Sequence, residues 1–325
     1  MIPFKKINLG NALEAVKPLI DSGYIGLGNV VFDFERELAE YVGAKYVVAL
    51  DSCTSALFLS LKWEMKHHKH RKQRKIMIPS MTVPLVACAA IEAGFYITFN
   101  DQTKWVGKYY KLEGTNVVDS AHELRRGQYA RMIKDEGYTD DLKLCFSFYP
   151  TKTIGSADGG AIATNNKEFA DWARTIATYG RNQAQKYGNS WDYDVVAIGY
   201  KRHYTNLQAA ICLEQLRRLD GTNTKRQAIT DKYNEALGLK NDSDYLYRID
   251  VEKRDEFIAY MKENGVECGV HFKPLHMMRP FRKFAVQNKE AIEAAYRTTV
   301  SLPHFDLMTD EEVARVIELT LAFKK

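Results

Sequence analysis

Short apolar segments alternate with stretches of helical periodicity through roughly the first 220 residues. Each apolar run predicts a buried strand, because it is bounded by turn residues and is too short for a helix. The expected strands are residues 47–50, 76–78, 95–99, 117–118, 144–146 and 160–163. The alternation predicts an α/β fold in which a mainly parallel sheet lies between two layers of helices, giving three αβα layers.

Helical patterns are clearest at residues 83–93, which end before Gly94, and at residues 206–218. After them, a polar stretch from 222 to 244 leads to a shorter αβ segment. Single cores stop growing near roughly 250 to 300 residues, so a chain of 325 residues is expected to form more than one. We predict a large domain at 1–221 and a small C-terminal α+β domain at 222–325.

Composition places the chain among ordinary globular proteins, with 46% hydrophobic and 27% charged residues. No apolar run reaches the roughly 18 residues that span a bilayer, and the first residues lack the apolar stretch of a signal peptide. We therefore expect a cytoplasmic protein without membrane contact. The five cysteines are odd in number and scattered, which favours buried thiols over disulfides or a metal site.

The formal net charge of +5 is unevenly distributed, because residues 66–75 (KHHKHRKQRK) form a nearly continuous basic run. Such a run can bind nucleic acid, or a metal through its histidines. A solvated loop before the strand at 76–78 is the plainer interpretation. No aromatic residue interleaves the run, which argues against base stacking, so we expect no nucleic-acid partner.

Lys152 and Asp119 are the residues most suggestive of chemistry. Lys152 follows the strand at 144–146 on a loop where a partly desolvated amine can become a nucleophile. Asp119 ends the strand at 117–118, at the sheet edge where α/β proteins bind ligands. Pyridoxal 5'-phosphate needs a lysine for its aldehyde and an acid for its ring nitrogen. The pair therefore indicates this cofactor, although a surface lysine and a helix-capping aspartate are the alternatives for each residue alone.

Hydroxyl groups suitable for a phosphate precede the helical stretch that starts near residue 56. Ser52, Thr54 and Ser55 lie there, and helix starts offer free N–H groups to anions. Capping is the alternative role for these hydroxyls, because the loop lacks glycine. Ser147 can add another hydroxyl, and His122 can contact the cofactor ring or be a satisfied polar histidine.

Ordered motifs along the whole chain resemble the DegT and StrS type of sugar aminotransferases, which are fold-type I pyridoxal-phosphate enzymes. The similar segments are DSCTSALFLSL, IMIPSMT, AIEAGFYITFND, VVDSAHE, FSFYPTKTIGSADGGAIATN, GYKRHYTNLQAAICLEQLRRLD, VHFKPLH and SLPHF. The chain looks like an unusually short member of this family.

The resemblance implies roles for individual residues. Lys152 would bind the cofactor aldehyde and later move protons as general base and acid, and Asp119 would pair with the ring nitrogen. His122 would contact the ring, while Thr54, Ser55 and Ser147 would hold the phosphate. The predicted catalytic residues are thus Lys152 and Asp119, and no metal site is expected. The predicted cofactor-binding residues are Thr54, Ser55, Asp119, His122, Ser147, Lys152 and Lys201.

The family resemblance also implies the reaction and the partners. Glutamate would donate an amino group, which a nucleotide-linked keto deoxysugar would then accept. Two chains would form a homodimer with shared active sites. A dehydratase of the same family is one alternative, but such enzymes replace the lysine with histidine, and Lys152 is present. A noncatalytic relative that binds a nucleotide sugar is the other alternative.

Three positions depart from the family pattern. Cys53 stands where the phosphate loop usually has glycine, and Val83 stands where an aromatic ring often covers the cofactor. Lys201, followed by Arg202, replaces an asparagine that reaches the partner's phosphate. The lysine can strengthen phosphate binding or be a solvated substitution.

The largest departure is a deletion. Only residues 102–116 separate the strand at 95–99 from the strand at 117–118, where the family has two helices and a strand between them. A segment of this length can just make one crossover between parallel strands. We expect the missing strand to belong to the sheet edge, so that the two flanking strands lie side by side in a smaller intact sheet.

Overall fold

The computed structural model describes residues 1–67, 74–181 and 193–323. Its main sheet has five strands in the order β1-β7-β6-β5-β4. The strands are β1 (Tyr46–Leu50), β4 (Tyr110–Lys111), β5 (Val117–Asp119), β6 (Lys143–Ser147) and β7 (Gly160–Thr164). Strands β5 and β6 are parallel, whereas the other neighbours in this sheet are antiparallel. Residues 68–73 of the basic run, with the metal or nucleic-acid role considered for it, lie outside the described residues.

A second pair of strands continues this arrangement. Strands β2 (Lys75–Pro79) and β3 (Tyr96–Asn100) are parallel to each other. Met77 of β2 forms an antiparallel bridge with Glu113, two residues beyond β4. The segment that follows β3 therefore lies between β2 and β5.

This position corrects the prediction for residues 102–116. The strands β3 and β5 are not side by side, because β4 occupies the space between the two sheets. A tight turn explains the difference: Thr115 N donates to Leu112 O, and Gly114 takes φ 91°, which favours glycine. The turn reverses the direction of the chain, so β4 pairs antiparallel with β5. Residues 102–116 therefore do not form a crossover between two parallel neighbouring strands.

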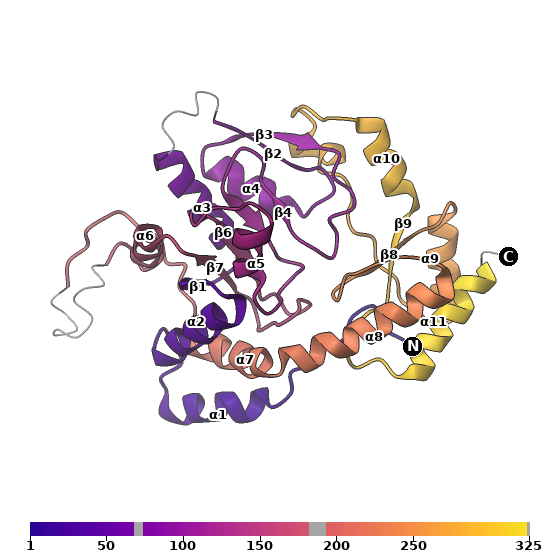
Figure 1. Ribbon diagram of the computed structural model, residues 1–325, viewed down its shortest axis with the longest axis horizontal. Coiled ribbons are helices and arrows are strands. Elements are labelled where there is room, and N and C mark those ends of the chain that lie inside the picture. Colours follow the sequence, from indigo (N-terminus) through magenta and orange to yellow (C-terminus); the bar gives the residue numbers. More distant parts are fainter. Residues whose placement is uncertain (68–73, 182–192, 324–325) are drawn as a thin grey trace.

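Helices cover both faces of the main sheet (Figure 1). Alternate residues of β1 point to opposite sides: Val48 and Leu50 join one hydrophobic cluster, and Val47 and Ala49 join another. The first cluster includes residues of α3, α4 and α6, and the second includes residues of α2, α5 and α7. These helices are α2 (Asn29–Val42), α3 (Cys53–His67), α4 (Pro84–Glu92), α5 (Gln128–Asp135), α6 (Lys167–Ala177) and α7 (Asn206–Arg217), with α1 (Ala12–Ser22) against α7.

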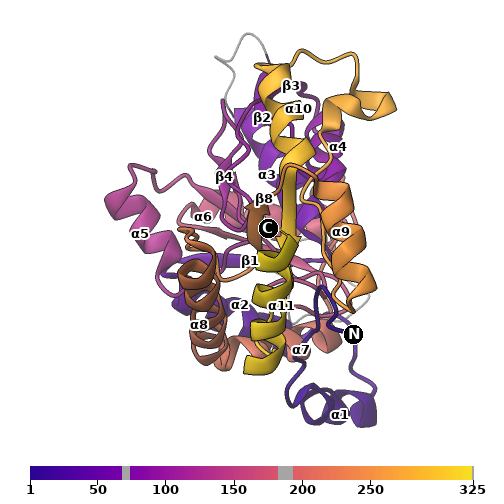
Figure 2. The ribbon, with the colours of Figure 1, turned by 90° about the vertical axis from the view of Figure 1, so that its right-hand side faces the viewer.

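A third hydrophobic cluster lies towards the C-terminus. It packs around the antiparallel strands β8 (Tyr247–Asp250) and β9 (Thr299–Leu302), with α9 (Arg254–Glu263) and α11 (Asp310–Phe323). Between these strands the chain also forms α10 (Lys289–Thr298) and the short 3₁₀ helices η2 (Leu275–Met277) and η3 (Arg279–Phe281). Figure 2 shows α9 and α11 beside β8 and β9.

One continuous helix links the second and third clusters. Helix α8 (Leu219–Leu237) begins with Leu219 in the second cluster, and its later residues Ile229 and Tyr233 belong to the third. Most of the polar stretch from 222 to 244 is therefore helical. The boundary predicted between residues 221 and 222 falls inside α8, and the division into two domains stays a prediction.

The α/β class and the layered arrangement are confirmed, but the main sheet is mixed rather than mainly parallel. Cysteines also differ in part from the prediction. Cys145 and Cys212 are buried and Cys53 and Cys268 are partly buried, whereas Cys88 is exposed on α4. Within the three described ranges, no helix combines the length and apolarity that a membrane crossing requires.

Candidate active site

Asp119 ends β5 and is almost fully buried, with 3% of its surface exposed. Its Oδ1 accepts a hydrogen bond from Ala121 N at 2.9 Å, and its Oδ2 accepts one from the Tyr110 hydroxyl at 2.8 Å. Burial raises the pKa of Asp119, while these donors and the nearby Lys152 ammonium oppose the rise. The carboxylate is thus an acceptor in a low-dielectric site, where it can hold a cationic partner strongly.

Lys152 lies on the loop after β6, in a turn where its N–H donates to Tyr149 O at 2.8 Å. Its Nζ lies 5.2 Å from the centre of the Tyr245 ring. Helix α7 contacts the loop through Gln215. The Gln215 Nε2 donates to Gly155 O at 2.6 Å, and its Oε1 accepts from Gly155 N at 3.1 Å. These contacts fix the backbone that carries the partly buried lysine.

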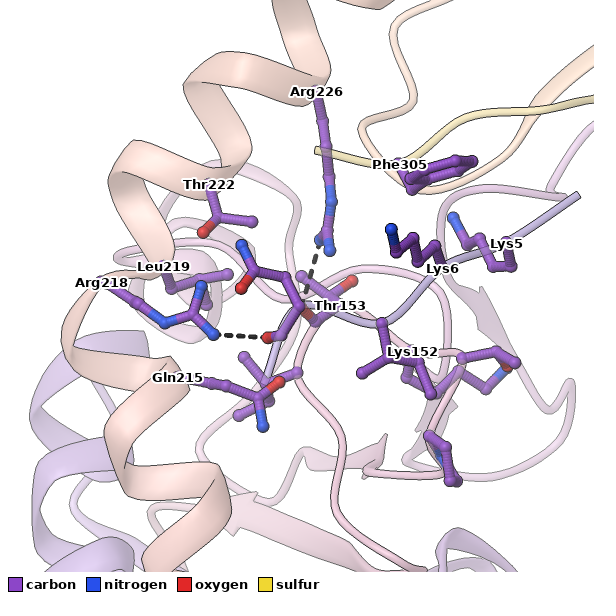
Figure 3. A pocket seen from close by; sticks show the side chains of 15 residues that line it. Lys5, Lys6, Lys152, Thr153, Gln215, Arg218, Leu219, Thr222, Arg226 and Phe305 are labelled. Atoms are coloured by element: carbon purple, nitrogen blue, oxygen red, sulfur yellow. Dashed lines mark hydrogen bonds between the residues drawn. The ribbon is translucent and has the colours of Figure 1, made fainter. Parts of the chain in front are cut away.

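A narrow pocket lies behind this loop and is rich in cations (Figure 3). Its basic residues are Lys5, Lys6, Lys152, Arg218 and Arg226. Arg226 is itself an anchor, because its Nη1 donates to Thr153 O at 3.1 Å and its Nη2 pairs with Asp306 at 3.1 Å. Burial, with Arg226 and Lys152 close by, lowers the pKa of Lys5.

His122 is buried, and the Gly107 N–H donates to its Nδ1 at 3.2 Å. Nδ1 must therefore lack a proton, which places the ring proton on Nε2 in the neutral form. Burial lowers the pKa of His122, and Lys152 lowers it further, so the ring stays neutral. The Trp105 ring stacks on His122 with centroids 4.9 Å apart.

Ser52, Thr54 and Ser55 gather where α3 begins. Ser55 N donates to Ser52 Oγ at 3.2 Å, and both hydroxyls donate to Asp51. Arg202 Nη1 donates to Ser55 Oγ at 3.1 Å. The helix start thus combines N–H groups, hydroxyls and one cation, which suits a phosphate.

Gly160 of β7 comes close to this helix start. A Cβ added there would lie 2.4 Å from Cys53 N, so a side chain would displace the backbone. The close approach occurs although Cys53 replaces the glycine of the family loop.

The remaining predicted residues are more peripheral. Ser147 ends β6 and is partly exposed. Lys201 is exposed and its backbone forms an isolated bridge with Thr178, whereas the Arg202 side chain contacts Ser55 at the helix start. Val83 is partly buried against the first cluster.

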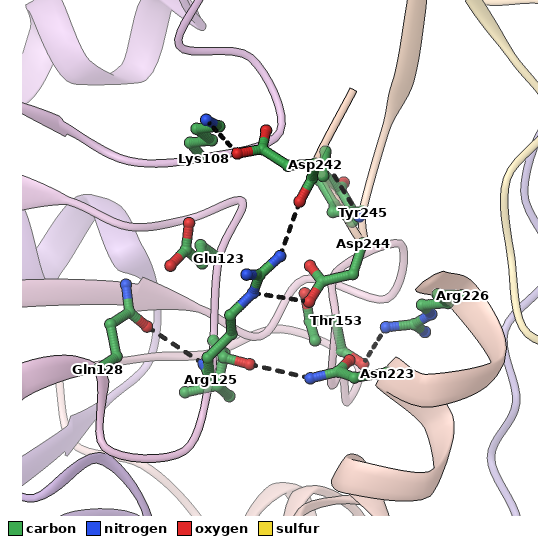
Figure 4. Close-up of polar contacts among 12 residues, drawn as sticks. Lys108, Glu123, Arg125, Gln128, Thr153, Asn223, Arg226, Asp242, Asp244 and Tyr245 are labelled. Atoms are coloured by element: carbon green, nitrogen blue, oxygen red, sulfur yellow. Dashed lines mark hydrogen bonds and ion pairs between the residues drawn. The ribbon is translucent and has the colours of Figure 1, made fainter. Parts of the chain in front are cut away.

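A polar network ties the loop after Asp119 to the C-terminal part of the chain (Figure 4). Arg125 Nε pairs with the buried Asp244 at 2.9 Å, and its Nη2 donates to Asp242 O at 2.8 Å. Asn223 of α8 donates to Leu124 O at 3.3 Å. The network positions the neighbouring Tyr245 beneath Lys152.

Four contact residues were absent from the prediction: Trp105, Tyr110, Arg202 as the cradle cation, and Tyr245. The aromatic residues carry no local sequence signal, because their roles depend on contacts across long sequence separations. The sequence shows that the charged Arg202 follows Lys201, but it does not show that the Arg202 side chain is directed towards Ser55.

Solved structures identify the fold. PseC from Helicobacter pylori, an aminotransferase of pseudoaminic acid biosynthesis, matches with a TM-score of 0.80 at 19% identity, covering 98% of both chains. Spr1654 of Streptococcus pneumoniae, solved in PLP and PMP forms, matches with a TM-score of 0.80 at 20% identity; in the PMP form the match covers 100% of both chains. The fold is that of the fold-type I aminotransferases.

Sequence comparison then gives the family. The model of the DegT/DnrJ/EryC1/StrS aminotransferase family matches residues 8–107 and 117–320. The spore coat polysaccharide biosynthesis protein SpsC of Bacillus subtilis is 30% identical, over 94% of this chain and 92% of its own length. The chain belongs to the DegT/DnrJ/EryC1/StrS aminotransferase family.

The donor set fits pyridoxal phosphate. An amine, a buried carboxylate and a neutral imidazole with its proton on Nε2 are connected by aromatic side chains. The Tyr245 ring lies between Lys152 Nζ and the His122 ring, and Tyr110, which contacts the Trp105 ring stacked on His122, donates to Asp119. The close approach of Gly160 leaves the helix start free of side-chain bulk on that side. Among the described residues, no cluster of three or more metal-ligating side chains is present.

Proposed function

We propose that this protein is a pyridoxal-phosphate-dependent aminotransferase that moves an amino group from glutamate to a nucleotide-linked keto deoxysugar. The observation that carries the proposal is that Lys152 shares one site with buried polar groups: its Nζ lies 5.2 Å from the centre of the Tyr245 ring, which in turn lies 4.8 Å from the His122 ring. Family membership supports the reaction class, and the sugar substrate follows the relatives' described roles.

When bound, pyridoxal phosphate supplies an aldehyde and an electron-withdrawing ring. Asp119 would hold the proton on the ring nitrogen, because its buried carboxylate gains by pairing with a cation. His122 would donate from Nε2 to the ring oxygen, since Nδ1 is committed to Gly107. Both residues would orient the ring from fixed backbone positions.

Thr54, Ser55 and Ser147 would donate hydroxyl hydrogen bonds to the phosphate, together with N–H groups at the start of α3. For this, the Ser55 hydroxyl would turn its proton from Asp51 to the phosphate. Arg202 would add a positive charge beside Ser55. Lys201 is exposed in its own chain, which is consistent with a role at the partner's phosphate.

Lys152 would take a proton, as general base, from the substrate carbon that carries the amino group. It would then donate the proton, as general acid, to a second carbon. Its Nζ lies over the Tyr245 ring, a position that favours a cation without binding it in an ion pair.

An acidic substrate is supported by unpaired positive charge near Lys152. Arg248 of β8 is largely buried, and its Nη1 has no hydrogen-bond partner among the described residues. Lys152, Lys5 and Arg248 all act with burial to lower the pKa of His271 to about 3. Both glutamate and the diphosphate of a nucleotide-linked sugar carry negative charge that could pair with Arg248.

Exposed apolar side chains support the homodimer. Tyr24, Ile25 and Leu27 are exposed before α2, and Val196 and Ile198 are exposed before Lys201, with 97% of Ile198 accessible. Surfaces of this kind mark interaction sites in soluble proteins. A second copy that covers residues 195–198 would also bring Lys201 to the interface.

The test is the visible absorption of the purified protein with pyridoxal phosphate, before and after glutamate, together with assay of 2-oxoglutarate. The wild type should show a band of bound cofactor that glutamate removes, with 2-oxoglutarate formed in proportion to enzyme. Lys152→Ala should do neither, while Lys134→Ala, on an exposed face of α5, should match the wild type. A glutamate response retained by Lys152→Ala would refute the proposal.

A further inference from the structure

Tyr110 lies in the part of the chain that the family model does not match, since the match stops at 107 and resumes at 117. Its contact with Asp119 is therefore a property of the shortened segment of this chain. The two residues are direct partners in the β4–β5 ladder, which places their side chains on the same face of the sheet.

The Tyr110 hydroxyl is part of a directed chain of hydrogen bonds. It lies 2.8 Å from Asp119 Oδ2 and 2.9 Å from Thr82 Oγ1. An ionised carboxylate only accepts, so Tyr110 donates to Asp119 and its oxygen accepts from Thr82. All three side chains are buried, with Thr82 0%, Tyr110 3% and Asp119 3% exposed.

These hydrogen bonds oppose the effect of burial on the pKa of Asp119. Desolvation favours the neutral acid, whereas donors favour the carboxylate. Burial, followed by the charge of Asp119, raises the pKa of Tyr110 far above its usual value, so its hydroxyl remains a donor. The Ala121 N–H holds the other carboxylate oxygen, so both oxygens have fixed directions.

The same segment also orients His122. The Gly107 N–H donates to Nδ1, and the Trp105 ring packs flat on the imidazole. Trp105 is itself held by a hydrogen bond of 3.1 Å from Nε1 to Met81 O, and its ring contacts Tyr110 at 4.5 Å. One short stretch thus reaches both polar groups that face the cofactor ring.

We propose that Tyr110 is a positioning residue that keeps the Asp119 carboxylate ionised and aimed at the cofactor ring nitrogen. The shortened segment thereby replaces part of the deleted elements with support for the cofactor site. This inference rests on the proposed function, because it assumes that Asp119 serves the ring nitrogen.

The test is the variant Tyr110→Phe, which keeps the ring and removes only the hydroxyl. Tyr109→Phe is the matched control, because the adjacent Tyr109 hydroxyl donates to Glu136 away from the site. Affinity for pyridoxal phosphate is titrated by absorbance across pH, without any sugar substrate. Thermal unfolding of each variant is recorded in parallel.

Loss of one hydrogen bond to a charged group should weaken cofactor affinity about tenfold or more in Tyr110→Phe. Its Asp119 should also protonate at a higher pH, so the loss of affinity on acidification should move up by about one pH unit. Tyr109→Phe should retain wild-type affinity and pH profile. A role in packing alone would change the unfolding temperature but not the pH profile.

Equal affinity and pH profile in the two tyrosine variants would overturn the inference while leaving the proposed function intact. A wild type that fails to bind pyridoxal phosphate would overturn both. If Tyr110→Phe does not fold, Thr82→Val removes the donor behind it: a smaller upward shift of the acid limb would support the inference, and an unshifted limb would refute it.

Discussion

Lys143 Nζ lies 2.7 Å from Glu64 Oε1, and neither side chain is exposed to solvent. The pair joins β6 to α3, the helix that begins at the candidate phosphate cradle. Asp141 also contacts Lys143 at 2.8 Å, from a partly exposed position. The cradle therefore depends on a buried charge pair at the far end of its helix.

Lys143→Met should lower the free energy of unfolding by about 3–5 kcal/mol, because Glu64 would remain buried without its cation. Urea denaturation measures this loss. The double variant Lys143→Met with Glu64→Gln should recover most of it, since the uncompensated charge is removed. A double variant as unstable as the single one would contradict this explanation.

Arg202→Met should weaken binding of pyridoxal phosphate by about tenfold, because a charge-assisted contact beside Ser55 is lost. Pyridoxal, which lacks the phosphate, should bind the variant and the wild type equally. Titration of both compounds separates the phosphate contact from a general change of the site. Equal losses for the two compounds would mean that Arg202 only supports the fold.

Gly160→Ala should destabilise the protein by about 1–3 kcal/mol and weaken cofactor binding, because the new methyl group meets the backbone of Ser52 and Cys53. Gly221→Ala is the control within α8, where no atom lies within 4 Å of the added Cβ. It should be neutral or stabilising by up to about 1 kcal/mol. Thermal unfolding with and without cofactor distinguishes the two variants.

Acidification should reduce stability partly through His304. Burial lowers the pKa of His304 to about 3, with Lys5 and Arg226 adding to the effect, whereas an unfolded histidine titrates near about 6.5. Between these values the unfolded chain binds more protons, so the free energy of unfolding rises with pH.

His304→Gln should reduce that slope by up to about 1.4 kcal/mol per pH unit. Urea denaturation at about pH 5 and about pH 6 gives the slope for each protein, since both values lie inside the window. If the slopes of wild type and variant agree, His304 already carries its proton in the folded state.

Local pattern was sufficient for six strands, whereas β4, β8 and β9 were not predicted individually. All six expected strands are present, and each end lies within one residue of its predicted position. Their apolar runs are buried on both faces, so residue type alone marks them. The helices predicted at 83–93 and 206–218 likewise match α4 and α7 to within one residue at each end.

The order and direction of strands could not be obtained in the same way. Placing β4 between β2 and β5 depends on a turn at Gly114 and on a bridge between Met77 and Glu113. Contacts such as those of Tyr110 with Asp119, or Arg202 with Ser55, also depend on the order and direction of the strands in the folded sheet. Sequence motifs indicated Lys152 and Asp119. The segment between residues 107 and 117, which the family model does not match, contained no motif that would indicate Tyr110.

Helix α8 runs unbroken from Leu219 in one core to Tyr233 in another, and Arg226 in its middle is bonded to the Thr153 carbonyl. A regular helix of this kind transmits force as a stiff rod. A displacement of the C-terminal core that moved α8 with it would therefore act, through Arg226, on the backbone adjoining Lys152.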